Sequence, residues 1–204
     1  LATSTLDFAT STVDFATSTP PFTATSTATS TPDSATSTPP LSQNLGTDIP
    51  DTTIISQNTT WTLAGSPYRL FINYQSQPTV APGATLTIEP GVKIISQGGN
   101  YPALIINGSL VAQGGAASST VLFTSRTDAA SSTPQKGDWQ GIAFNAGSSG
   151  SLDNVEFHYA VKALQIKDSS PIISNSKFLN NIRAVYIESQ TATTSPQITN
   201  STFD

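Results

Sequence analysis

The side chains that could carry chemistry are few and lie far apart in the sequence. His158 is the only histidine, and it has no evident Asp or Ser partner. Asp128, Asp138 and Asp153 fall near expected turns. Hydrolysis of a glycosidic bond needs two carboxyl groups about 5 to 9.5 Å apart, and no register of the chain's repeat places two of these aspartates in adjacent turns. We therefore expect no catalytic residues and no enzymatic activity.

The composition also gives no basis for a metal site or for thiol chemistry. A metal site needs several His, Cys or clustered acidic ligands, and the chain has one histidine and no cysteine. The lack of cysteine also excludes a disulfide framework. We expect no metal and no cofactor.

A repeat near the C-terminus indicates which elements position the remaining side chains. Residues 152–157 align with 173–178, and these align in turn with 198–203. One repeat of about 20 residues with short strands and turns is typical of one coil of a solenoid. Equivalent residues of successive coils should stack about 4.8 Å apart. The alignment predicts a structural ladder of two inward-facing columns: Asn154, Asn175 and Asn200 in one, and Phe157, Phe178 and Phe203 in the other.

The same pattern extends toward the N-terminus. Four apolar positions between residues 86 and 94 match four between residues 104 and 112. Residues 51–204 then correspond to roughly seven coils. The matched pairs are Leu86 with Leu104, Ile88 with Ile106, Val92 with Leu110, and Ile94 with Ala112.

Several segments share features with a known family. The stretches GATLTIEPGVKI, ALIINGSLVAQG, GDWQGIAF, SLDNVEFHYA and SPIISNSKF resemble the right-handed parallel β-helix repeats of bacterial cell-surface and secreted proteins, over about residues 80–204. The resemblance implies an all-β fold, a right-handed single-stranded parallel β-helix over residues 46–204. That fold carries pectate lyases, other polysaccharide-active enzymes, adhesins and structural proteins, so it implies no single function.

Charged residues fall into pairs between successive coils of this repeat. Two pairs have opposite charges and are interpreted as ion-pair ladders. The third pair brings two cations together; we interpret it as two solvated cations, with an anion-binding spot as the alternative. The pairs are Glu156 with Lys177, Lys167 with Glu188, and Lys162 with Arg183.

Residues 1–45 have a different composition, dominated by Thr, Ser and Pro. The segment Leu6–Thr12 recurs as Val13–Thr19. Such sequences form neither helix nor core, and we predict an extended tail. It is either a disordered or O-glycosylated stalk, or an arm that packs on neighbouring subunits through Phe8, Phe15 and Phe22, which are evenly spaced.

Composition also limits compartment and partners. Only 10% of residues are charged, and the net charge is −5. The sequence has no run of basic residues, so we expect no nucleic-acid partner. No stretch approaches about 18 consecutive apolar residues, so we expect no membrane insertion. Abundant Thr, Ser, Asn and Gln are typical of exported proteins. We expect an extracellular or cell-surface location, and an N-terminus at Leu1 fits removal of a signal peptide or a trimmed chain.

The C-terminal coil motivates the functional hypothesis. The chain stops at Asp204, partway through a coil, with no cap evident, so Ile198 and Phe203 would be exposed. Open parallel strands are templates for further pairing, and a head-to-tail contact that does not close produces a filament. We therefore expect a structural subunit whose partners are other copies of itself. The alternatives are a stalked adhesin or carbohydrate-binding module for a surface polysaccharide and, on fold resemblance alone, a polysaccharide lyase or hydrolase.

Overall fold

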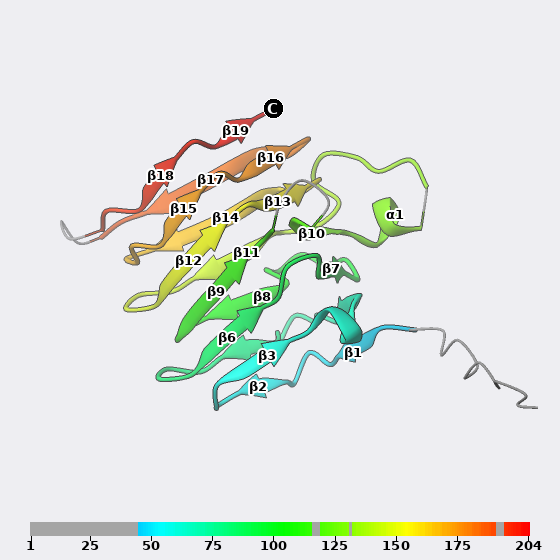
Figure 1. Ribbon diagram of the computed structural model, residues 1–204, viewed down its shortest axis with the longest axis horizontal. Helices are drawn as coiled ribbons and strands as arrows, with labels where there is room; N and C mark the ends of the chain where they lie inside the picture. Colours follow the sequence, from blue (N-terminus) through cyan, green and yellow to red (C-terminus); the bar gives the residue numbers. More distant parts are fainter. Residues whose placement is uncertain (1–44, 116–118, 131, 191–193) are drawn as a thin grey trace, which may run out of the picture. The chain divides into compact units, whose positions relative to one another are not determined.

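The computed structural model describes residues 45–115, 119–130, 132–190 and 194–204, which form a parallel β-solenoid (Figure 1). Three sheets, A, B and C, run along it, and the chain visits them in that order in every turn. The strands of successive turns pair in parallel, as β1 and β4 of sheet A do between Thr47 and Tyr68. The predicted all-β solenoid is confirmed. The tail residues Phe8, Phe15 and Phe22 lie outside the described residues.

The strands are short, with two to six residues each. Sheet A contains β1 (Thr47–Ile49), β4 (Tyr68–Leu70), β7 (Lys93–Ser96), β10 (Val121–Ser125), β13 (Val155–His158), β16 (Lys177–Leu179) and β19 (Thr202–Phe203). Sheet B contains β2 (Ile54–Ile55), β5 (Thr79–Val80), β8 (Leu104–Ile106), β11 (Ile142–Phe144), β14 (Lys162–Lys167) and β17 (Arg183–Glu188). Sheet C contains β3 (Thr59–Trp61), β6 (Thr85–Ile88), β9 (Ser109–Gln113), β12 (Ser149–Asp153), β15 (Ile172–Ser174) and β18 (Gln197–Thr199).

The described residues form about six turns, fewer than the roughly seven expected. Strands β1 to β18 make six complete passes through the sheets, and β19 begins another. The middle turns are longer than the C-terminal repeat: Ile94 pairs with Phe123, and Phe123 pairs with Phe157, whereas Phe157 pairs with the much closer Phe178. The longer of the two middle turns includes the short helix α1 (Arg126–Ala129); a 3-10 turn, η1 (Leu63–Gly65), lies near the first turn.

Four phenylalanines form a continuous column inside sheet A. The ring centroids of Phe123 and Phe157 are 4.8 Å apart, those of Phe157 and Phe178 are 5.3 Å apart, and those of Phe178 and Phe203 are 5.1 Å apart. Their planes differ by 9° or less. The repeat placed three of these rings in one column, and the structure adds Phe123. Parallel pairing imposes this offset stacking, because equivalent Cα atoms are one strand spacing apart.

The asparagines of the predicted ladder do not point inward, which corrects that expectation. Asn154, Asn175 and Asn200 lie at the corner between sheets C and A with φ of 53°, 49° and 49°. Asn175 and Asn200 are exposed, and Asn154 is half-buried. Asparagine tolerates the left-handed conformation better than other non-glycine residues, so this column reflects a backbone requirement of the corner.

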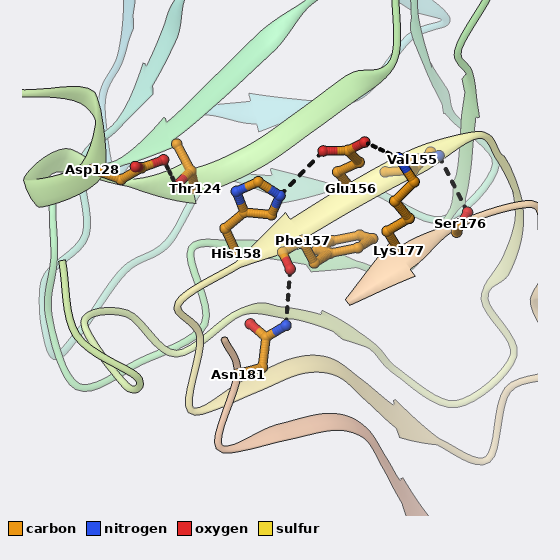
Figure 2. A network of polar contacts seen from close by, with 9 residues as sticks. All are labelled: Thr124, Asp128, Val155, Glu156, Phe157, His158, Ser176, Lys177 and Asn181. Atoms are coloured by element: carbon orange, nitrogen blue, oxygen red, sulfur yellow. Dashed lines mark hydrogen bonds and ion pairs between the residues drawn. The ribbon is translucent and has the colours of Figure 1, made fainter. Parts of the chain in front are cut away.

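The residues that follow Asn175 and Asn200 are serines, and they form a polar ladder between turns. Ser176 Oγ accepts a hydrogen bond from Val155 N at 3.2 Å (Figure 2). It also donates one to Ser174 O at 2.8 Å. Ser201 Oγ repeats the first contact with Ser176 N, also at 3.2 Å. These serines supply the inward hydrogen bonds between turns, whereas the amide of Asn175 donates to the side chain of Asp153, Nδ2 to Oδ1 at 2.7 Å.

The predicted match of residues 86–94 with residues 104–112 is also wrong. Leu86 lies in sheet C and pairs with Leu110, whereas Leu104 lies in sheet B and pairs with Ile142. The alignment had matched β6 with β8 and β7 with β9, strands that lie two apart along the chain and in different sheets. Strands of all three sheets direct apolar residues inward, so apolar pattern alone does not distinguish one sheet from another.

Variants at this corner test its backbone origin. Asn175→Gly should change the free energy of unfolding by less than about 1 kcal/mol, because glycine adopts positive φ freely. Asn175→Val should cost at least about 1–2 kcal/mol, and Ser176→Ala about 1–3 kcal/mol, since Val155 N–H loses its acceptor. Urea unfolding measures all three. Equal losses for Asn175→Gly and Asn175→Val would show that the amide side chain, and not the backbone, is what the corner needs.

Candidate functional site

The outer face of sheet A carries a connected polar network centred on β13 (Figure 2). Val155 and Phe157 point inward, so the alternation of a strand directs Glu156 and His158 outward. Glu156 Oε2 lies 3.2 Å from His158 Nε2, and Lys177 Nζ lies 3.0 Å from Glu156 Oε1. Lys177 is the Cα partner of Glu156 in the next turn. One carboxylate thus links a cation and a histidine across two turns.

A second pair of polar side chains adjoins His158 from the preceding turn. Thr124 follows Phe123, the partner of Phe157, and so lies beside His158 in the sheet. Its Oγ1 donates to Asp128 Oδ2 at 2.7 Å. Figure 2 shows Glu156 on one side of the His158 ring and Thr124 with Asp128 on the other.

The insertion after β10 brings two acidic residues to one serine. Ser125 caps α1 by accepting a hydrogen bond from Asp128 N at 3.2 Å, and its hydroxyl donates to Asp138 Oδ2 at 3.3 Å. The repeat placed no two aspartates in one column. Asp128 and Asp138 both contact Ser125 from the insertion after β10. Residues of this insertion have no equivalents in the neighbouring turns, so an alignment of the repeat could not place them. The N-cap spacing from Ser125 to Asp128 is the sequence signal that could have indicated half of this arrangement.

Buried contacts fix the backbone beneath this network. Trp139 is 1% exposed and its Nε1 donates to the carbonyl of His158 at 2.7 Å. Asn181 Nδ2 donates to the carbonyl of Phe157 at 2.8 Å, and Asn181 Oδ1 accepts from Ala160 N at 2.7 Å. The carbonyls at the end of β13 are therefore held from the turns on both sides, which makes the outer network a rigid one.

The arrangement is best described as an electrostatic clamp between turns. The side chains of Glu156 and His158 are only 18% and 19% exposed, and both carboxylate oxygens of Glu156 have a partner. Within the described ranges, no three His, Asp or Glu side chains come together as metal ligands. The ion pair predicted between Glu156 and Lys177 is confirmed, and the partner found for His158 was missed because it lies two residues away on the same strand.

The other two predicted charge pairs are also partners between adjacent turns, but neither forms an ion pair among the described residues. Lys167 and Glu188 are Cα partners, but the ion pairs of the described residues do not join them. Lys162 and Arg183 are also partners, and both lie near the ring of Tyr186, with Lys162 Nζ 4.1 Å and Arg183 Cζ 5.6 Å from its centroid. Adjacency of the two cations was predicted; the aromatic ring they share was not.

The residues predicted to act in assembly divide into two groups. Ile198 is half-buried and Phe203 is 52% exposed at the edge of the last turn. The others, Phe8, Phe15 and Phe22, fall outside the described residues.

Comparisons of the chain with protein-family models, with curated proteins and with solved structures find no match. In the described part of the chain, no helix has both the length and the apolar character needed to cross a membrane.

A double-mutant cycle tests the clamp. Glu156→Gln and Lys177→Met should show a coupling energy of about 0.2–1 kcal/mol in the free energy of unfolding, a value typical of partly exposed ion pairs. The matched cycle of Lys167→Met and Glu188→Gln should show coupling near zero, because that pair makes no ion pair. Equal coupling in the two cycles would contradict the assignment.

Proposed function

We propose that the protein is an extracellular structural protein, a subunit of a head-to-tail filament or surface layer of stacked solenoids. The supporting observation is the edge of the last turn. Phe203 stacks on Phe178 with centroids 5.1 Å apart, yet 52% of Phe203 remains exposed. Ile187 of the same turn is 49% exposed. A further coil that docked on this edge could therefore extend the columns of stacked side chains that end at Phe203 and Ile187.

The backbone at this edge supports the same interpretation. Strands β17, β18 and β19 end their sheets and pair on one side only. Unpaired strand edges are templates for another strand. The same surface would receive a second copy or further residues of a longer chain, and the experiment below separates these occupants.

Continuation of the columns specifies how a second copy would dock. The column that ends at Ile198 begins at Trp61, and the column that ends at Phe203 begins at Thr47. In-register stacking places the bulky Phe203 over the small Thr47. Ile55 and Trp61 of the first turn are only 7% and 4% exposed, so stacking would bury little more of their apolar surface. We therefore expect assembly to require high concentration.

A charge at the open edge tests the proposal. Wild-type protein should form filaments by electron microscopy and sedimentation velocity. Phe203→Asp should raise the concentration needed for assembly by at least about tenfold, because the contact loses a buried ring worth about 1.5–3 kcal/mol. Tyr74→Asp is the matched control, since Tyr74 is 71% exposed and lies in the loop between β4 and β5. A wild-type chain that stays monomeric at high concentration would contradict self-assembly and favour coverage of the edge by another segment.

The proposed role of the tail has its own test. Deleting residues 1–40 should weaken the filaments and leave the circular dichroism and melting temperature of the solenoid unchanged. A tail that spans neighbours would add avidity, which deletion removes. Filaments of undiminished stability after deletion would exclude a role of the tail in assembly and leave a stalk as its interpretation.

A further inference from the structure

The outer face of sheet B over the last two turns carries a second cluster of polar side chains. Lys162 of β14 and Arg183 of β17 are Cα partners, so their side chains leave adjacent strands about 4.8 Å apart. Both charged groups lie near the ring of Tyr186, at 4.1 and 5.6 Å from its centroid. The face of an aromatic ring attracts cations, so Tyr186 holds the two charges together.

In the described part of the chain, no carboxylate forms an ion pair with either of these cations. The ion pairs among the described residues involve Arg69, His158 and Lys177, and none involves Lys162 or Arg183. Two like charges on neighbouring strands repel each other, and an anion between them would interact favourably with both. The guanidinium of Arg183 can bind a carboxylate with two parallel hydrogen bonds.

A shallow hollow lies beside Tyr186 on the same face. Its polar lining comes from Asn145, Gln165, Lys167 and Glu188. Asn145 Nδ2 donates to Asn107 Oδ1 at 2.8 Å, and Gln165 Nε2 donates to the carbonyl of Gln140 at 2.9 Å. Both amides are thus held in position before any ligand arrives. Amide oxygens are acceptors for hydroxyl groups, and a few fixed polar groups beside an aromatic surface are typical of small-ligand subsites.

We propose that Lys162, Arg183 and Tyr186, with the hollow beside them, bind an acidic polysaccharide through a sugar carboxylate. The cation pair would hold the carboxylate, and the amides would contact hydroxyls of the adjoining sugar. A nucleic acid fits less well, because its binding depends on neutralising many phosphates, and this site offers one cation pair on a chain with a net charge of −5. The site uses the outer face of sheet B, whereas the proposed assembly uses the inward columns at the edge of the last turn.

Calorimetric titration of the full chain with an oligogalacturonate tests the site. Arg183→Gln and Lys162→Gln should each weaken binding about tenfold, as expected for loss of a hydrogen bond to a charged group. Binding should weaken with added salt, and the methyl-esterified oligomer should not bind. Lys93→Gln is the matched control, because it removes the same charge from sheet A.

Several outcomes would overturn the proposal. Undetectable binding by the wild-type chain, or an equal loss for Lys93→Gln, would show that no specific site exists. Tighter binding of single-stranded DNA that is also lost in Arg183→Gln would assign the site to nucleic acid. Repeating the titration with Phe203→Asp separates the two proposals, since that variant should bind the oligomer normally while needing a higher concentration to assemble.

Discussion

Hydrogen bonding between parallel strands of successive turns is the constraint on which the rest of this structure depends. It fixes the spacing between turns at about 4.8 Å, so each side chain lies on its equivalent in the next turn. The phenylalanine column stacks for this reason. So does the ladder from Ser176 to Ser201, in which each hydroxyl serves the backbone of the turn before it. The same constraint makes a corner with positive φ recur, which selects asparagine at Asn154, Asn175 and Asn200.

The part of the fold that could be predicted is the C-terminal repeat, where residue types recur together with the apolar pattern. Phe157 and Phe178 are partners across a turn without an insertion, so the alignment found their column. Leu86 and Leu110 are partners in sheet C, but the two segments share only an apolar pattern, and a search for that pattern matched Leu86 with Leu104 of sheet B instead. The asparagine column was recognised, but residue type did not tell a corner from an inward position. The left-handed preference of asparagine is the physical signal that decides between them.

On the outer faces of the sheets, too, contacts between equivalent residues of adjacent turns could be predicted, and other contacts could not. The clamp between Glu156 and Lys177 joins direct partners of adjacent strands, and column alignment predicted it. Asp128 contacts Thr124 only because an insertion folds back on sheet A. Residues of such a loop have no equivalents in other turns, so an alignment of the repeat does not predict their contacts. Tyr186 follows Arg183 on the same strand, so its approach to both cations depends on side-chain direction. The fold carries many functions, and only such surface features distinguish among them.

Assembly by continued stacking is the central functional claim, and amide hydrogen exchange tests it most directly. Strands β13 and β14 have a partner on both sides, so their amides should exchange slowly at every protein concentration. The amides of β17, β18 and β19 that do not donate to β14, β15 and β16 lie at the open edge of the last turn and should exchange quickly in dilute solution. If copies stack, these amides and the unpaired amides of β1, β2 and β3, which would pair with them, should become protected as the concentration rises. Exchange at the edge that does not depend on concentration would contradict stacking.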